Sequence, residues 1–280
     1  MFEKYFMKGH VMQNALEKRI SELENRLAEE KKFASIGKIT GAVAHELNNI
    51  FTGIGTYPEV LMMDENLGPE VIRGLEMIKD SGQSASAVVR DLLTICQGVR
   101  AEKSPVDMNA VLENYIRSHD FEKLKQHYNS VKIEVNKAPG QLYINGSPLH
   151  IEKIMMNLFL YAARELAHMH DGKISIKTAV KIVLESSACH RNEQMIPGEY
   201  VVLSVAFNSC SMDKKLIFDH KNTSQLFAPF FVKNTMGKTG TGLELTLVRS
   251  VVQNHNGYVH LECNENQTCF ELLFPADRNP

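Results

Sequence analysis

The sequence has few of the features that would place it outside the cytoplasm or inside a membrane. Five cysteines are scattered over 280 residues, and no two of them form a Cys-x-x-Cys pair. An odd, unpatterned set favours reduced thiols over a disulfide framework. No apolar run approaches the roughly 18 to 20 residues that cross a bilayer, and the N-terminus lacks the apolar core of a signal peptide. We therefore expect a soluble, cytoplasmic protein without membrane insertion.

The chain also lacks a strong excess of either charge. It carries 31 basic and 33 acidic side chains, so no overall field points to nucleic acid or to an anionic membrane surface as a partner. Apolar residues make up 44% of the sequence. At this length, that is enough for one large domain or two ordinary ones.

The N-terminal part of the chain has the spacing of long helices. Apolar residues recur at intervals of three and four between residues 16 and 27, with charged residues between them, which predicts a coiled-coil helix over residues 1–34. A single amphipathic helix lying on its own domain is the alternative. The pattern continues through residue 54 and weakens for one turn near GIGTYP. It stops at DENLGPE, residues 64–70, which has the asparagine, glycine and proline of a turn.

A second helix is expected after this turn, and together the two predict a helical hairpin over residues 35–100. The apolar positions of the second helix alternate in steps of four and three: Val71, Leu75, Ile78, Gly82, Ala85, Val89, Leu92 and Cys96. Each helix therefore has a narrow apolar stripe that one hairpin leaves partly exposed. Pairing with a second copy would cover both stripes, so we expect a homodimer with a four-helix bundle.

The pattern changes after residue 104 to helices and mostly antiparallel strands. Asp107 is expected to cap one helix, and Ser147 with Pro148 to begin a longer one. Strands are predicted at residues 131–136, 142–145, 172–185, 198–208, 257–263 and 268–274. This order predicts an α+β sandwich over residues 104–280, with one sheet covered by helices on one face.

The stretch AVAHELNNI, residues 42–50, places three chemically useful side chains on one part of the first helix. Residues three and four apart are neighbours on a helix, so His45 and Glu46 both lie beside Asn49. His45 points away from the apolar stripe, towards solvent or a docking partner. An imidazole beside a carboxylate can act as a nucleophile, although an ordinary surface pair is the alternative.

The residues around this patch resemble a known family. FASIGKITGAVAHELNNIFTGI, residues 33–54, is similar to the H-box of two-component sensor histidine kinases, and LFAPFF, residues 226–231, resembles their F-box. The similarity extends over about residues 34–275. It implies a dimerisation and histidine-phosphotransfer hairpin followed by an ATPase-like domain of the Bergerat type. It also implies that His45 is the phosphoacceptor, that Glu46 acts as general base, and that Asn49 positions water for phosphatase action.

The same resemblance implies a nucleotide site, but several of its motif positions differ here. NLFLYAAR keeps Asn157 and Arg164 and has Tyr161 in place of an asparagine that would ligate Mg²⁺. A neutral phenol is a poor substitute for the compact oxygen ligands that Mg²⁺ prefers. Phe207 stands where an aspartate would accept a hydrogen bond from adenine. Losing such a charge-assisted bond costs roughly 1.5 to 3 kcal/mol.

Further changes surround these positions. Ser209 and Ser211 replace two glycines of the adenine motif, and a shift of one residue would place Asn208 at its acidic position instead. In GKTGTGLELT the phosphate loop keeps three residues of its pattern, which are Gly240, Gly242 and Leu243. Glu244 replaces a further glycine and adds negative charge near the phosphates. We therefore expect a degenerate site without a bound cofactor. HMH, residues 168–170, is interpreted as a helix end and not as a metal site.

Three functions remain open at this point. The first is a histidine phosphotransferase or pseudokinase that exchanges phosphate with the receiver domain of a response regulator. The second is an active sensor histidine kinase that uses ATP and Mg²⁺. The third is a non-enzymatic dimeric regulator of another kinase or response regulator. Whether the chain is an enzyme is therefore left open by its sequence.

Overall fold

The computed structural model describes residues 46–64, 66–96, 102–167, 169–184, 187–189, 193–208, 225–231, 241–264 and 266–278. The chain divides into two compact units, one ending at Val89 and the other beginning at Arg90. The expected coiled coil over residues 1–34, the expected phosphoacceptor His45 and the expected loop residue Gly240 lie outside the described residues.

The described part of the first unit is a pair of helices. Residues 46–61 are helical, and after a short connection α2 runs over Pro69–Cys96. The connection contains a local turn in which the Asp64 carboxylate accepts a hydrogen bond from the Asn66 backbone N–H at 3.0 Å. The first helix continues without a break through GIGTYP, where the sequence predicted a weakened turn. A proline removes only one backbone donor, and the Pro58 carbonyl still accepts from Met62 N–H at 2.9 Å.

The two helices are close to one another at a glycine. A Cβ atom added to Gly82 would lie 2.9 Å from Ile54 Cγ2 and 3.1 Å from the Gly55 backbone nitrogen. Those distances are too short for an ordinary contact, so the absence of a side chain at this position lets the backbones approach. An ion pair between Lys79 and Glu59, with 2.7 Å between its charged atoms, joins the same helices.

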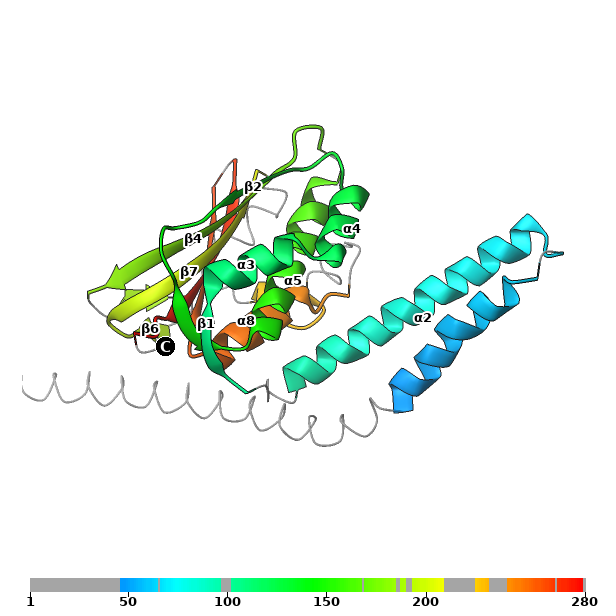
Figure 1. Ribbon diagram of the computed structural model, residues 1–280, viewed down its shortest axis with the longest axis horizontal. Helices are drawn as coiled ribbons and strands as arrows, with labels where there is room; N and C mark the ends of the chain where they lie inside the picture. Colours follow the sequence, from blue (N-terminus) through cyan, green and yellow to red (C-terminus); the bar gives the residue numbers. More distant parts are fainter. Residues whose placement is uncertain are drawn as a thin grey trace, which may run out of the picture. The chain divides into compact units, whose positions relative to one another are not determined.

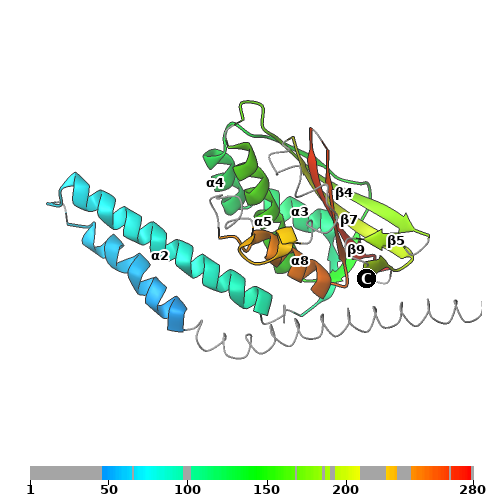
Figure 2. The same ribbon diagram turned by 180° about the vertical axis from the view of Figure 1, so that it is seen from behind.

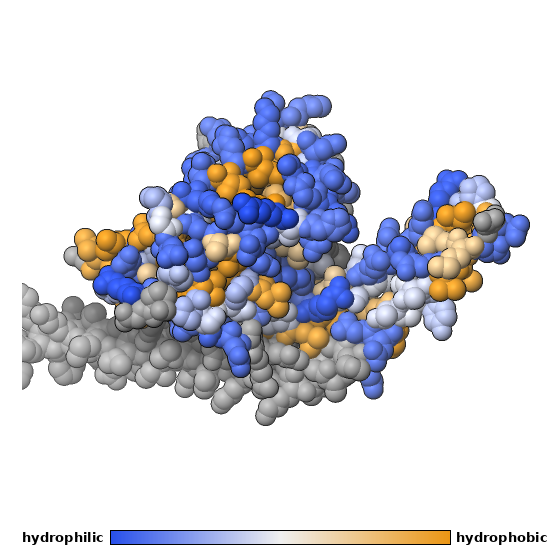
Figure 3. All heavy atoms as spheres, in the orientation of Figure 1, coloured by the Kyte–Doolittle hydropathy of each residue, from blue (hydrophilic) through white to orange (hydrophobic). Residues whose placement is uncertain are grey.

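The helix pair leaves many apolar side chains in contact with solvent. Figure 3 shows such side chains gathered near the turn of the hairpin. The exposed fraction reaches 73% for Tyr57 and 78% for Met63. The remaining exposed apolar residues of the pair are Ile50, Ile54, Val60, Leu61, Val71, Met77 and Ile78. Several of these belong to the apolar stripes that the sequence analysis identified. None of the helices among the described residues is long and apolar enough to cross a membrane.

The second unit is built on a five-stranded sheet with the order β2-β4-β7-β9-β8. The strands are β2 (Lys132–Asn136), β4 (Lys173–Val183), β7 (Gly198–Phe207), β8 (Tyr258–Cys263) and β9 (Thr268–Pro275). Only the β2–β4 pair is parallel, while the other three pairs are antiparallel. A small second sheet pairs β1 (Ser104–Asp107) with β3 (Tyr143–Gly146).

Helices gather on one side of the five-stranded sheet (Figures 1 and 2). They are α3 (Met108–Ile116), α4 (His119–His127), α5 (Pro148–Leu166) and α8 (Glu244–Asn254), with a short 3₁₀ helix, η2, at Gln225–Phe227. The predicted cap is confirmed, since the Asp107 side chain accepts from Asn109 N–H. Pro148 opens α5 as expected, but Ser147 makes no side-chain capping bond. The predicted α+β arrangement is confirmed, and α4 was not predicted.

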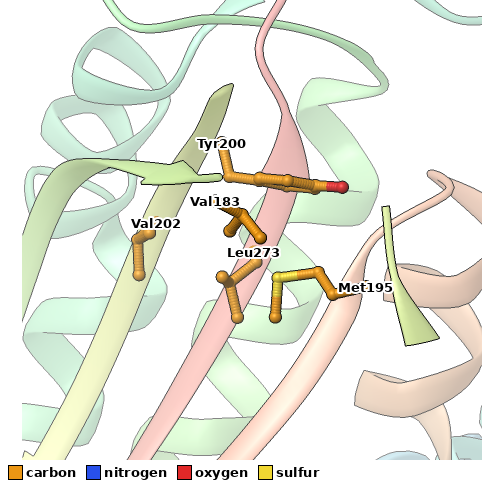
Figure 4. Close-up of a cluster of buried hydrophobic side chains, with 5 residues drawn as sticks. All are labelled: Val183, Met195, Tyr200, Val202 and Leu273. Carbon is orange, nitrogen blue, oxygen red and sulfur yellow. The ribbon is translucent and has the colours of Figure 1, made fainter. Parts of the chain in front are cut away.

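The opposite side of the sheet has a small apolar cluster of its own. The hairpin of β5 (Ser187–Cys189) and β6 (Glu193–Met195) interrupts the connection between β4 and β7. Met195, the last residue of β6, packs with Val183, Tyr200, Val202 and Leu273 (Figure 4). The register explains this face, because Val202 lies opposite Leu273 on the neighbouring strand. Neither this hairpin nor the cluster was predicted from the sequence.

Candidate functional site

The described part of the segment that resembles an H-box begins at Glu46 and is helical. Glu46 and Asn49 are both exposed and lie three residues apart, which places them on one face of that helix. The neighbouring Asn48 belongs to another face, since its side-chain oxygen accepts a hydrogen bond from Ser86 Oγ in α2 at 3.4 Å. Glu46 and Asn49 therefore lie on a face that α2 leaves open to solvent. His45 precedes the described residues.

The three α5 residues of the expected nucleotide site follow a spacing of four and three, so they lie along one side of that helix. Asn157 is buried, and its Nδ2 donates to the Lys153 carbonyl one turn earlier at 2.8 Å. Tyr161 is also buried, whereas Arg164 is partly exposed at the last turn of the helix. The side chain of Asn157 is thus used in part by its own helix.

Tyr161 and Phe207 belong to one aromatic cluster. The centroid of the Tyr161 ring lies 6.2 Å from that of Phe207 and 5.7 Å from that of Phe270, both in edge-to-face geometry. Phe207 and Phe270 are stacked with 6.4 Å between their centroids. Both phenylalanines are buried. Phe207 ends β7 on the same face of the sheet as its register partner Ile174, which is also buried. The two unusual motif residues therefore form part of the core.

The hydroxyl group of Tyr161 is unusual within this cluster. It is buried, and it has no hydrogen-bond partner among the described residues. Burial, with smaller contributions from the charges of Glu165 and other groups, raises the pKa of Tyr161 well above its ordinary value. The phenol is therefore neutral near pH 7. A buried hydroxyl without a partner costs about 1 to 3 kcal/mol.

Asn208, the alternative candidate for the adenine position, has both side-chain atoms engaged elsewhere. Its Nδ2 donates to the Asp171 carbonyl at 2.8 Å, and its Oδ1 accepts from the Lys173 backbone N–H at 2.6 Å. These bonds join the end of β7 to the start of β4. The amide holds two strand ends together, so releasing it for another partner would break two hydrogen bonds.

The loop before α8 has the features of an anion-binding turn, and a side chain of the same chain fills it. Gly242 has a positive φ of 76°, a conformation that is natural for glycine and strained for most other residues. Leu243 follows as a buried residue directly before α8. The carboxylate of Glu244 accepts from Thr241 N–H at 3.0 Å and from Gly242 N–H at 2.9 Å. Arg164 donates to the same carboxylate at 2.5 Å.

Electrostatics favour the charged form of Glu244. Burial alone would raise its pKa, but hydrogen bonds from backbone N–H groups and from Arg164 outweigh that effect, and the pKa is lowered below its ordinary value. The carboxylate is therefore ionised near neutral pH although its residue is only 8% exposed. An anion is stabilised in this place by charge-assisted bonds from two separate elements.

The F-box segment is joined to the same loop. Phe230 has a positive φ of 62° and donates its backbone N–H to the Gly242 carbonyl at 2.8 Å. Phe227 of η2 packs against Phe270, with 6.5 Å between ring centroids. Arg249 of α8 lies over the Phe227 ring at 5.9 Å from its centroid. The segment that resembles an F-box therefore contacts both the loop and the aromatic cluster.

Three aspects of this site were not predicted. The sequence indicated the negative charge of Glu244 but not that its carboxylate folds back on the loop amides. It also missed Phe270, which joins Tyr161 to Phe207, and the use of Asn208 between two strands. A glutamate at the first position of a helix, after a glycine-containing loop, was the one available signal for the first of these. In the described part of the chain, no group of three His, Cys, Asp or Glu side chains is arranged to hold a metal ion.

Comparisons with known proteins agree with this architecture. Residues 146–278 match the family described as histidine kinase-, DNA gyrase B- and HSP90-like ATPase. The second unit therefore contains an ATPase fold of the histidine kinase type. Similarity to sensor kinases extends over about 90% of the chain. Residues 146–278 therefore belong to this ATPase family, and the chain as a whole is similar to two-component sensor histidine kinases.

Individual relatives are distant and longer than this chain. Sensor kinase CckA of Brucella abortus is 21% identical over 90% of this chain and 25% of its own length. Sensory histidine kinase/phosphatase NtrB of Rhizobium meliloti is 23% identical over 91% of this chain and 63% of its own length. Sporulation kinase B of Bacillus subtilis is 22% identical, with 91% and 53% covered. The chain thus spans less than two thirds of these curated relatives.

Solved structures support the fold. The structure of full-length ShkA in complex with AMPPNP has a TM-score of 0.63 with 16% identity, and 85% of this chain and 46% of that chain are covered. Histidine kinase AdeS of Acinetobacter baumannii has a TM-score of 0.52 with 17% identity, and the covered shares are 84% and 98%. At these identities the likeness concerns the fold alone.

Proposed function

We propose that this protein is a two-component phosphotransfer protein. In this proposal His45 exchanges a phosphoryl group with the receiver domain of a response regulator, and the ATPase-like domain does not bind nucleotide productively. The protein would then act as a homodimer and would take its phosphate from a phosphorylated receiver, not from ATP. The similarity to sensor kinases and the sequence of residues 33–54 support the first part, and the contacts of Tyr161 and Phe207 support the second.

The observation that carries the proposal is the packing of Tyr161 and Phe207. By resemblance these residues stand at the magnesium and adenine positions, and both are buried in the aromatic cluster with Phe270. A neutral, buried phenol offers no carboxamide or carboxylate oxygen for Mg²⁺. A buried phenylalanine ring cannot accept a hydrogen bond from an adenine amino group. The residues present therefore do not fit ATP with Mg²⁺.

The H-box chemistry is independent of that site. In the forward step an unprotonated ring nitrogen of His45 attacks the phosphorus of a receiver aspartyl phosphate. The new P–N bond forms as the P–O bond to the aspartate breaks, and the aspartate leaves as a carboxylate. A histidine with a pKa of about 6.5 is mostly unprotonated near neutral pH. Glu46 would hold the proton on the other ring nitrogen, and the receiver would supply its own Mg²⁺.

Asn49 gives the same surface a second outcome. Its exposed position three residues after Glu46 suits a side chain that orients water towards a phosphorylated receiver. Water attack on the aspartyl phosphate would release inorganic phosphate and regenerate the aspartate. Transfer to His45 and loss to water therefore compete for one phosphoryl group.

Dimer formation is supported by the exposed apolar side chains of the helix pair. Tyr57, Val60, Leu61 and Val71 remain in contact with solvent in one copy. Removing apolar surface from water stabilises association by about 25 cal/mol per Å² before the entropic cost of binding. A second copy of the hairpin would cover these side chains in a four-helix bundle.

The experiment uses radioactive phosphate from two sources. The dimer is incubated with labelled ATP and Mg²⁺ alone, and separately with a panel of receiver domains labelled by acetyl phosphate. We expect no label from ATP and rapid label from at least one receiver. His45→Ala should abolish that labelling, whereas Asn49→Ala should keep it and slow the release of inorganic phosphate.

Each alternative function has its own result. Labelling of His45 by ATP would establish the active kinase and refute the proposal. Stable binding to a labelled receiver without any transfer would establish the non-enzymatic regulator. If His45→Ala takes up label from the receiver as fast as the unchanged protein, another residue is the acceptor.

A further inference from the structure

The loop of residues 241–243 and α5 place three donors around one carboxylate. Thr241 N–H, Gly242 N–H and the Arg164 guanidinium all donate to Glu244. Arg164 comes from a different helix, 80 residues earlier in the chain. Donors that converge from separate elements form a site for an anion, and the anion here is covalently part of the chain.

A simple helix cap does not account for this arrangement. Carboxylates near the start of a helix are favourable because of its dipole, but a surface carboxylate gains that effect while remaining in water. The Glu244 residue is 8% exposed, so it has given up most of its hydration. Burying a charge is unfavourable unless it is paired and hydrogen-bonded. The loop amides and the guanidinium meet that condition by taking the place of water.

We propose that Glu244 is a built-in ligand of this loop: its carboxylate occupies an oxyanion site formed by Thr241 N–H, Gly242 N–H and Arg164, and it holds the loop on α5 without any bound nucleotide. Truncating the side chain uncovers that site for a small free oxyanion such as phosphate. This inference deepens the proposed function and rests on it in one respect, namely that no nucleotide phosphate competes with the carboxylate.

The groups around the carboxylate are consistent with a single bound anion. Arg164 forms an ion pair with it. The charge of Glu244 contributes to the raised pKa of Tyr161, after burial and the charges of Glu165 and Cys263. The Gly242 carbonyl is held by Phe230 N–H at 2.8 Å, which keeps the loop in place when its amides face the anion. Removing Glu244 would leave Arg164 and two loop amides without their acceptor.

The test is a thermal unfolding series on the full chain with Glu244→Ala. In chloride buffer we expect the Tm to fall by roughly 5 to 10 °C, because a buried charge pair is broken from one side. Inorganic phosphate at about 50 mM should raise the Tm of this variant by roughly 3 to 5 °C, the shift for a ligand with a dissociation constant of about 5 mM. The unchanged protein should shift by less than about 1 °C, since its site is filled. Sodium chloride of equal ionic strength serves as the reference.

Three further variants separate an oxyanion site from a general loss of charge. Glu102→Ala removes a negative charge from an exposed position and should show neither the fall in Tm nor the phosphate effect. Glu244→Gln keeps the shape of the side chain but loses its charge, so its Tm should fall while the filled site stays insensitive to phosphate. Glu244→Ala combined with Arg164→Ala should lose the phosphate effect, because the cation is absent.

Several results would overturn the inference. One is a Glu244→Gln protein with the Tm of the unchanged protein, which would show that the charge is not needed. Another is a phosphate shift in Glu244→Ala no larger than in Glu102→Ala. If Glu244→Ala is recovered folded only in phosphate, the inference is supported. If this variant folds in neither buffer, the Tm of Glu244→Gln decides: a fall supports the inference, and an unchanged Tm overturns it. Micromolar binding of ATP by the unchanged protein would refute the proposed function, whereas the phosphate comparison tests the inference separately.

Discussion

A substitution at Tyr161 tests the packing of the aromatic cluster most directly. Tyr161→Asn restores the residue type that the family motif has at this position. It removes a buried ring that packs on Phe207 and Phe270 at centroid distances of 6.2 and 5.7 Å. Deleting a buried aromatic ring costs about 3 to 5 kcal/mol, and an amide buried without partners adds about 1 to 3 kcal/mol. We expect a total near 4 kcal/mol or above.

The matching change keeps the ring and removes the hydroxyl. Tyr161→Phe deletes a buried oxygen without a partner among the described residues, so it should be neutral or should stabilise the fold by about 1 kcal/mol. Tyr200→Phe is the contrasting control, because its hydroxyl donates to the Ile196 carbonyl at 2.7 Å. Losing that bond should cost about 1 kcal/mol.

Thermal unfolding of the full chain measures all three variants. For a unit of this size, 1 kcal/mol corresponds to about 2 to 4 °C in Tm. We expect a fall of roughly 8 to 16 °C for Tyr161→Asn, a slight rise for Tyr161→Phe, and a fall of about 2 to 4 °C for Tyr200→Phe. A fall in Tm for Tyr161→Phe as large as that for Tyr200→Phe would mean that the Tyr161 hydroxyl has a partner, and the reasoning would be wrong.

Three further outcomes are expected. Gly82→Ala should lower the melting temperature of the helices followed by circular dichroism, because its Cβ would lie 2.9 Å from Ile54 Cγ2. Gly74→Ala is the control, since its Cβ meets nothing within 4 Å, and it should stabilise α2 by about 1 kcal/mol. An equal rise in melting temperature for both variants would refute the close contact at Gly82. Burial lowers the pKa of His255 below its ordinary 6.5, so the unfolded chain binds the proton first and stability should fall as pH drops below about 6.5. His255→Gln should flatten that dependence, although the lowered pKa of His150 leaves part of it. Leu92→Asp should shift the proposed dimer towards monomer in light scattering at micromolar concentration, by burying an unpaired charge in the helix pair.

Much of the architecture was predictable because the signals for it are local. Asp107 accepts a hydrogen bond from a backbone N–H two residues away. Pro148 fits the first turn of α5 because a backbone N–H in that turn has no acceptor within the helix. The strand β7 is a nearly continuous apolar run that is buried along most of its length, and β9 is also mostly buried. Helix α4 was missed because its sequence, HDFEKLKQH, buries only Phe121, so it has no apolar stripe to detect.

The contacts of the site were less predictable because they join residues that are distant in the chain. Motif positions identified Tyr161, Phe207 and Glu244 as unusual, but they did not show what each side chain contacts. Phe270 approaches Tyr161 only after β9 pairs with β7. Arg164 reaches Glu244 only when α5 and α8 are packed on the same sheet. Such contacts depend on the tertiary fold and have no signature in a short stretch of sequence.

The bond between Arg164 and Glu244 also limits how this sequence can change over time. A change from glutamate to glycine at position 244 leaves the guanidinium and two loop amides without an acceptor, so the substitution lowers stability before any new binding compensates for it. A change from tyrosine to asparagine at position 161 also lowers stability, because it removes a ring from the aromatic cluster. Each of these single changes therefore passes through a less stable protein. The packing therefore favours keeping the present residues at both positions.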